Sequence, residues 1–311
     1  MSNEDKTPYD LGNSRNIREL IMAALAQDEE DKREQIIHEL QNKQDSESVF
    51  LAAKELCASE EPQERALGAE ILGFLGFPDR PFIKDSADIL TRMISKENDS
   101  DVIYYIVDAL RHLEDFRVIG NVEIHGRAPI YLKNYPAIIP HILPFVDHSD
   151  AEVRTVIVLA LGAALLNTPG HEDKSAVKAL IKLSADKDRN VRDWAVFELG
   201  AEHLTLVEWP EITEALLKRV SDEDAEVRSQ ALLGLARRHT AGTVELLIHE
   251  LSWQLAQENI SDYTLEAAYE LADHSLCPVL CRFKDNFDSE WVEKALEACK
   301  CNTFRIRERK V

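Results

Sequence analysis

The chain has 311 residues, and its 57 acidic and 36 basic side chains give a formal net charge of −21. This charge repels nucleic-acid phosphates and anionic lipid and attracts cationic partners, although acidity can also serve solubility alone. No run of about 18 apolar residues is present, so we expect no membrane span. The polar start, residues 1–16, lacks the apolar core of a secretory signal, which predicts a cytoplasmic protein.

The N-terminal part of the chain predicts paired helices. We expect residues 1–15 to be disordered and one helical array to cover residues 16–303, followed by a basic tail at 304–311. Apolar residues keep a helical spacing over six segments, which are residues 16–25, 36–40, 50–57, 65–75, 85–94 and 102–113. The first two are expected to form the N-terminal cap of the array, because they show the polar outer face that such a cap needs.

Residues 114–135 interrupt this pattern as an insertion. Within them, residues 118–124 place β-branched side chains around Gly120-Asn121, which predicts a short hairpin or an extended loop. Insertions in repeat arrays often contact partners, but a spacer without function is the more common outcome. Both interpretations stay open.

One sequence block recurs in the centre of the chain, over residues 147–162, 186–200 and 222–236. Each copy has an acidic turn, then Val-Arg, then apolar residues at helical spacing. Val153, Val191 and Val227 are separated by 38 and 36 residues. Repetition at this period predicts a solenoid of helix pairs.

A weaker fourth copy follows at residues 261–273, where Tyr263-Thr264 replaces Val-Arg. Two more helices are expected, one opening at Pro278 and one over residues 291–299. The array is therefore predicted to continue almost to the end of the chain.

The cysteines are five in number: Cys57, Cys277, Cys281, Cys299 and Cys301. An odd set without a secretory signal argues against a disulfide framework. The last four raise the alternative of a zinc site, but the chain has no Cys-x-x-Cys pair. We therefore expect buried thiols and no metal.

The acidic turn, Val-Arg, Ala or Ile and Leu-Gly pattern resembles the HEAT-like repeats of the phycobilisome-lyase type, over roughly residues 60–275. The resemblance implies an all-α, right-handed α-solenoid whose second helices line a concave surface. It implies no single activity, because such folds include scaffolds, inhibitors, lyases and a few DNA-repair enzymes. It also implies a structural ladder between adjacent repeats, formed by Asp150, Asp188 and Asp224 with Arg154, Arg192 and Arg228.

The sequence contains no catalytic signature. It has no Gly-rich phosphate loop, no His-Glu-x-x-His and no Gly-x-Ser-x-Gly. His171-Glu172-Asp173 is more typical of a solvated turn than of a metal site. Adjacent Asp193 and Trp194 raise a DNA-glycosylase alternative, but such enzymes need a basic track that this acidic chain lacks. We predict no enzymatic activity, no cofactor and no bound metal.

Residues off the core stripe of the second helices are the candidate partner-binding residues, and by the HEAT resemblance they face the concavity. They are Tyr104, Tyr105, Asp108, Asp193, Trp194, Phe197, Gln230, Glu266 and Tyr269. Aromatic rings among carboxylates suit a protein partner rich in Arg or Lys. The alternative is that several of these rings pack between repeats.

Long acidic HEAT arrays of this size look like bacterial immunity proteins. This resemblance predicts a protein that binds and neutralises a cationic toxin domain, with no need for homo-oligomerisation and no nucleic-acid or membrane partner. An assembly scaffold or regulatory adaptor is the first alternative, and a lyase-like or glycosylase-like enzyme is the second.

Overall fold

The computed structural model describes residues 16–77, 79–114, 138–166, 173–205, 209–287 and 289–301. These segments are helical and contain no strand, which confirms the predicted all-α class. The tails at 1–15 and 304–311, the hairpin proposed at 118–124, and His171-Glu172 lie outside the described residues.

The chain divides into two compact units, Met1–Tyr135 (unit 1) and Pro136–Val311 (unit 2). The division falls at the end of the predicted insertion, and the single array predicted for residues 16–303 stays a prediction.

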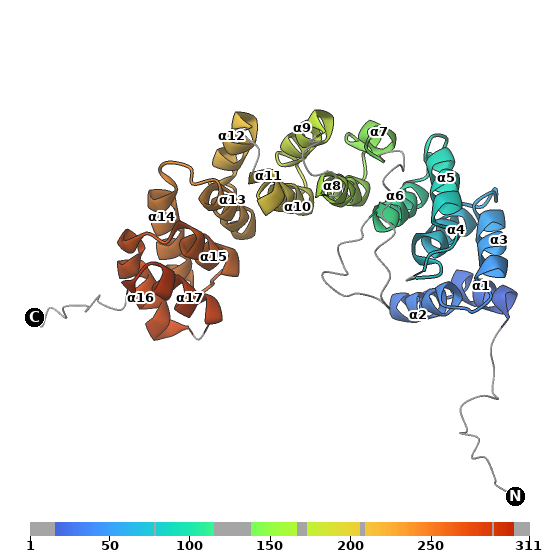
Figure 1. Ribbon diagram of the computed structural model, residues 1–311, viewed down its shortest axis with the longest axis horizontal. Helices are drawn as coiled ribbons and strands as arrows, with labels where there is room; N and C mark the ends of the chain where they lie inside the picture. Colours follow the sequence, from blue (N-terminus) through green and yellow to red (C-terminus); the bar gives the residue numbers. More distant parts are fainter. Residues whose placement is uncertain are drawn as a thin grey trace, which may run out of the picture. The chain divides into compact units, whose positions relative to one another are not determined.

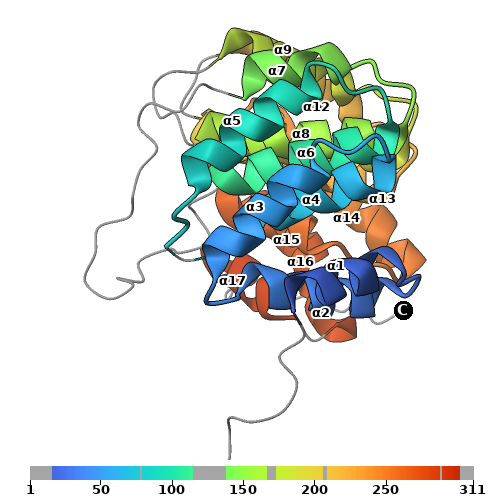
Figure 2. The ribbon, with the colours of Figure 1, turned by 90° about the vertical axis from the view of Figure 1, so that its right-hand side faces the viewer.

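Unit 1 consists of helix pairs. Helices α3 and α4 lie side by side, as do α5 and α6, and α4 contacts both α2 and α6 (Figures 1 and 2). The six helices among the described residues of unit 1 are α1 Ile17–Leu25, α2 Glu30–Gln41, α3 Ser46–Leu56, α4 Pro62–Phe74, α5 Ile83–Ile94 and α6 Ser100–Glu114. Their positions match the six segments predicted from the apolar spacing.

Unit 2 repeats the same arrangement. Helices α8, α10, α13, α15 and α17 contact one another in succession, and α9, α12, α14 and α16 each pair with the next helix of that row (Figure 1). The row is α8 Ala151–Leu166, α10 Arg189–Leu199, α13 Ala225–Arg237, α15 Asp262–Leu271 and α17 Glu290–Ala298. The other helices are α7 Ile139–Ile142, η2 Leu143–Phe145, α9 Lys174–Leu183, α11 Glu202–Thr205, α12 Pro210–Arg219, α14 Thr243–Gln257, η3 His274–Leu276 and α16 Cys277–Asn286.

The acidic turn of each repeat starts the following helix. The Asp188 side chain accepts hydrogen bonds from the backbone N–H groups of Asn190 and Val191, and Asp224 does the same at the start of α13. Asp150 accepts from the N–H of Glu152. These carboxylates satisfy N–H groups that have no partner within their own helix.

A ladder of arginines links successive repeats, but its carboxylates are not the predicted ones. Arg154 donates to both carboxylate oxygens of Asp186 at 2.8 Å, and Arg192 does the same to Asp222 at 3.0 Å. The predicted partners Asp150, Asp188 and Asp224 are helix caps instead, and Asp224 also pairs with Arg189 at 2.7 Å. The carboxylates that bind Arg154 and Arg192 therefore lie two residues before the helix caps.

Gly200 at the end of α10 and Gly234 in α13 permit close packing of these two helices. A Cβ atom on Gly234 would lie 2.8 Å from the Cα of Gly200 and 2.9 Å from Cδ1 of Leu216. The two helices therefore approach each other at a distance that only a residue without a side chain allows. This contact fixes the α10–α13 pair, which carries the surface described below.

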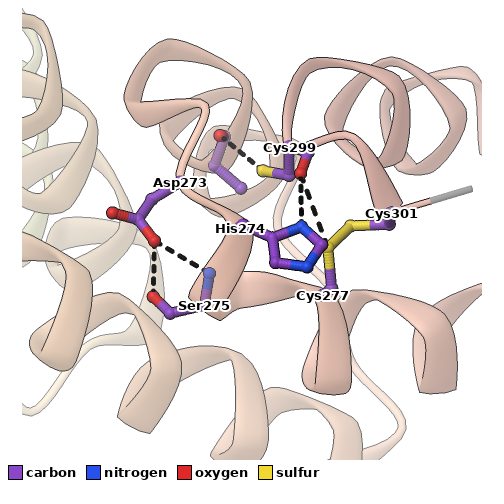
Figure 3. The surroundings of a disulfide bond; sticks show 7 residues. Asp273, His274, Ser275, Cys277, Cys299 and Cys301 are labelled. Atoms are coloured by element: carbon purple, nitrogen blue, oxygen red, sulfur yellow. Dashed lines mark hydrogen bonds between the residues drawn. A yellow bond between two sulfur atoms is a disulfide. The ribbon is translucent and has the colours of Figure 1, made fainter. Parts of the chain in front are cut away.

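The C-terminal cysteines correct a second prediction. Cys277 and Cys301 form a disulfide bond, whereas the sequence argued against one (Figure 3). Cys277 begins α16 and Cys301 follows the end of α17, so the packing of these two helices brings the sulfurs together. Cys299 is a buried thiol that donates to the carbonyl oxygen of Ala268, and burial raises the pKa of this thiol to about 11.

The other cysteines are thiols as predicted: Cys57 is buried, and Cys281 is half-buried. Disulfides persist chiefly in oxidising surroundings, so the bond gives no support to the location predicted from the sequence.

Candidate protein-binding surface

Three aromatic rings from two helices meet on the surface of unit 2. Trp194 and Phe197 of α10 are 40% and 38% exposed, with ring centroids 5.8 Å apart in an edge-to-face arrangement. Phe197 in turn lies 6.3 Å from the ring of Tyr263 at the start of α15. Solvent-exposed aromatic rings held in this way are typical of protein-binding surfaces.

The exposure of these rings follows from the helical period of α10. Val191, Ala195 and Leu199 are fully buried along one stripe, which leaves positions 194 and 197 on another face. The local sequence of α10 therefore determines that these two rings point away from the buried face of the helix.

Carboxylates adjoin the rings. Asp193 is half-buried, and its Oδ1 atom is buried with no hydrogen-bond partner among the described residues. Burial raises the pKa of Asp193, the nearby Arg189 lowers it, and Glu226 and Asp224 raise it further. The pKa of Tyr263 is also raised, first by burial and then by Glu226, Asp193 and Glu266. The carboxylates therefore act electrostatically on Tyr263 as well as on Asp193.

We call Asp193, Trp194, Phe197, Glu226 and Tyr263 the acidic–aromatic surface. The first three of these residues are predicted from the sequence, whereas Glu226 and Tyr263 are not. Tyr263 stands where the other blocks have a core valine, and it remains half-exposed. A large ring in place of a buried valine is the signal that could have indicated it.

Glu266, also predicted, is already engaged within the fold. It accepts a hydrogen bond from Arg237 at 2.6 Å, and Arg237 also donates to the carbonyl oxygen of Gly200 at 3.1 Å. Glu266 therefore ties α15 to α13, and Arg237 extends the link to the end of α10.

The two remaining predicted residues of unit 2, Gln230 and Tyr269, differ in solvent exposure. Gln230 is buried, which leaves it little surface for a partner. Tyr269 is exposed and lies 6.1 Å from the ring of Trp291, over which the Lys294 ammonium group sits at 4.5 Å. Tyr269 therefore remains available on the surface, whereas Gln230 does not.

The predicted residues of unit 1 form a separate network. Arg33 of α2 pairs with Glu70 at 2.6 Å and places its guanidinium 5.4 Å from the ring centre of Tyr105. Tyr104 is in edge contact with Tyr105 at 5.4 Å. The ring of Tyr105 is thus partly covered by a side chain of its own unit.

Asp108 is likewise paired within its own helix. It accepts from Arg111 at 2.7 Å and lies 3.4 Å from His112. Burial alone would raise the pKa of Asp108, but hydrogen bonds and charge from His112 and Arg111 hold that pKa below its usual range. The carboxylate is therefore ionised and already compensated.

Metal and membrane sites receive no support from the described segments. Within these segments, no group of three or more His, Cys, Asp and Glu side chains is placed to hold a metal ion. Two of the cysteines considered for zinc are joined in the disulfide. No described helix is long and apolar enough to cross a bilayer.

The acidic–aromatic surface lies within a stretch of helical repeats of known type. Residues 177–272 match the family of HEAT repeats, and this range contains the whole surface. The resemblance to HEAT-like repeats is thereby confirmed for this part of the chain, and HEAT repeats generally mediate contacts between proteins.

Solved structures agree with this fold. The X-ray structure of YibA from Escherichia coli is 22% identical, with a TM-score of 0.65, and the match covers 92% of this chain and 93% of that one. An engineered protein with a crystal structure is 17% identical, with a TM-score of 0.50, over 91% of this chain and 77% of that one. Similarity at these identities shows an all-α solenoid fold and no more.

A third structure is the complex of CpcE and CpcF of phycocyanin lyase from Nostoc sp. PCC7120. It is 15% identical, with a TM-score of 0.41, and the match covers 96% of this chain and 99% of that one. No match is found among curated proteins.

Proposed function

We propose that this chain is a non-enzymatic HEAT-repeat protein that binds a basic protein through the acidic–aromatic surface of unit 2. The observation that supports this function is the pairing of exposed Trp194 and Phe197 with carboxylates that have no cationic partner among the described residues. Aromatic side chains contribute much of the energy at protein interfaces, and unpaired carboxylates attract cations.

The strong negative charge of the chain suggests what such binding achieves. A net charge of −21 speeds the association with a cationic protein and disfavours acidic competitors. The partner we propose is a cationic toxin domain, which is neutralised when the acidic surface occupies the track that binds phosphate. An assembly scaffold or adaptor would use the same surface without blocking an activity.

Affinity capture from the native host, repeated over a salt series, tests the proposal. The double variant Trp194→Ala, Phe197→Ala is compared with Leu217→Ala, which removes an equally exposed apolar side chain on α12. We expect the wild type and Leu217→Ala to retain a basic partner at low salt and to lose it at high salt. The double variant should lose the partner at all salt concentrations while its circular dichroism stays unchanged.

A folded double variant that retains full partner affinity would show that the surface is misplaced. An acidic partner that is insensitive to salt would contradict the electrostatic part of the proposal. Once a partner is purified, its toxicity or enzymatic activity is measured with and without this chain. Loss of that activity on binding supports neutralisation, whereas unchanged activity favours the scaffold.

A further inference from the structure

Two arginine side chains within the fold each contact one carboxylate and one aromatic ring. In unit 1, Arg33 pairs with Glu70 at 2.6 Å and lies 5.4 Å from the ring centre of Tyr105. In unit 2, Arg228 donates to both oxygens of Glu250, at 2.9 and 3.0 Å, and lies 4.6 Å from the ring centre of Trp253. A planar cation that stacks on a ring and forms a fork of hydrogen bonds suits this arrangement.

The arginines of these two sites are less exposed to solvent than the lysine that occupies a third site of this kind. The Arg33 and Arg228 side chains are 21% and 12% exposed, whereas Lys294, which stacks over Trp291 and pairs with Glu290, is 44% exposed. Arginine loses less on desolvation than lysine because its charge is delocalised and more weakly hydrated. Where a ring and a carboxylate are partly buried, this fold therefore uses arginine.

The acidic–aromatic surface has the same components but no cation of its own. Asp193 is half-buried and carries a buried oxygen without a hydrogen-bond partner among the described residues, and the rings of Trp194, the next residue in the chain, and Phe197 are exposed. The Glu226 side chain makes no ion pair with any described residue, although its backbone N–H is bonded to Asp224. Elsewhere in the fold, Arg33 and Arg228 supply the cation where a carboxylate and an aromatic ring lie together.

The two arginines nearest to this surface are already held by other carboxylates. Arg189 pairs with Asp224 at 2.7 Å, and Arg237 pairs with Glu266 at 2.6 Å. Each therefore pairs with another carboxylate, so Asp193 and Glu226 form no ion pair among the described residues, although the charge of Arg189 still acts on Asp193.

We propose that the acidic–aromatic surface is an arginine-recognition site, in which a guanidinium group of the partner stacks on the exposed ring of Trp194 and pairs with the carboxylates of Asp193 and Glu226. This inference rests on the proposed function and specifies the partner's chemistry: the basic protein presents an arginine, not a lysine, to this site.

Two peptides of equal length and charge test this recognition, one with arginine as its only basic residue type and one with lysine. Calorimetric titration into the full-length chain gives both affinities at one salt concentration. We expect the arginine peptide to bind about tenfold more tightly, because stacking and the forked hydrogen bonds are available only to the guanidinium.

Two substitutions locate the preference. Asp193→Asn and Trp194→Ala should each bring the affinity for the arginine peptide down to that for the lysine peptide. Glu245→Gln on α14 removes the same charge from an exposed position and should leave the preference unchanged. Circular dichroism and the unfolding midpoint establish that each variant is folded.

Equal affinities for the two peptides, or no binding of either, would overturn the arginine site. So would a loss of preference in Glu245→Gln as large as that in Asp193→Asn. If both peptides bind equally in a salt-dependent way, the basic partner of the proposed function survives and the arginine site does not. Partner capture that withstands the Trp194→Ala, Phe197→Ala change refutes the proposed function itself.

Discussion

Arg154 and Asp186 are joined by two hydrogen bonds of 2.8 Å, although 32 residues separate them in the sequence. Arg154 also donates to the carbonyl oxygens of His148 and Ser149, at the turn that precedes its own helix. One side chain thus fixes its own turn and links it to the next repeat.

A simple rule describes the carboxylate of this ladder. Asp186 lies two residues before the helix cap Asp188 and accepts its backbone N–H, and Asp222 bears the same relation to Asp224. Glu97 and Asp99 repeat the pattern in unit 1, where Glu97 accepts from Arg65 at 2.8 Å. In these three turns, the carboxylate two residues before the cap binds the arginine, and the cap residue satisfies the start of the helix.

Arg192→Ala is expected to destabilise the protein strongly. Its bond to Asp222 is buried on both sides, and the substitution would leave Asp222 and the carbonyl oxygens of Asp186 and Lys187 without this donor. We expect the free energy of unfolding to fall by about 3 kcal/mol. Urea unfolding followed by circular dichroism measures the change.

Arg189→Ala provides the matched control, because the Arg189 side chain is 51% exposed whereas that of Arg192 is 7% exposed. Its loss should lower the free energy of unfolding by less than about 1 kcal/mol. Equal effects of the two substitutions would contradict a structural role of the buried ladder.

Gly234→Ala should disturb the contact between α10 and α13. The new methyl group would meet Cα of Gly200, a backbone atom that cannot move away cheaply. We expect a loss of about 1–3 kcal/mol in the free energy of unfolding, together with a change in Trp194 fluorescence as α10 shifts. An unchanged unfolding midpoint would show that the two helices separate more easily than this packing implies.

Asp193→Asn should stabilise the protein slightly at neutral pH. The folded-state pKa of Asp193 is raised, mainly by burial, so ionisation opposes folding; this cost is present above the folded pKa and absent below the unfolded one. The gain should be about 1 kcal/mol or less, and it should vanish as the pH falls below the ordinary aspartate range. Urea unfolding at several pH values measures it, and a gain that persists in acid would contradict this reasoning.

The opposite pH dependence is expected of the ladder. Burial acts to raise the pKa of Asp186, but the hydrogen bond from Arg154, the Asp188 N–H and the Arg154 charge together hold it below its usual value. The stability from this pair is present above the unfolded pKa and is lost as the pH falls through the folded pKa. Asp186→Asn should therefore abolish part of the acid-induced loss of stability, and an unchanged acid profile would count against the pair.

The Cys277–Cys301 bond should leave three titratable thiols in the denatured, unreduced protein: Cys57, Cys281 and Cys299. The Cys277→Ser, Cys301→Ser variant should lose about 3 kcal/mol of stability, since the bond closes a loop between residues 24 apart. Reduced wild-type protein should match this variant. Five reactive thiols before reduction would show that the bond does not form.

Adjacent residues determined much of this fold. The spacing of Val191, Ala195 and Leu199 predicts both the helix α10 and the exposure of Trp194 and Phe197, because a helix of fixed period divides its own side chains between core and surface. The acidic turns likewise specify where helices begin, since a cap and the N–H groups that it satisfies lie within three residues of each other.

Tertiary structure decided the pairing of residues that are distant in the sequence. Sequence alone did not show that Arg154 binds Asp186 and not an aspartate that caps a helix, that Arg33 covers Tyr105, or that Cys277 meets Cys301. Gln230 looked equivalent to Glu266 by position, yet it is buried. These outcomes depend on which side chains neighbouring repeats bring to the same place, and the helical period of one segment carries no information about the side chains of the next.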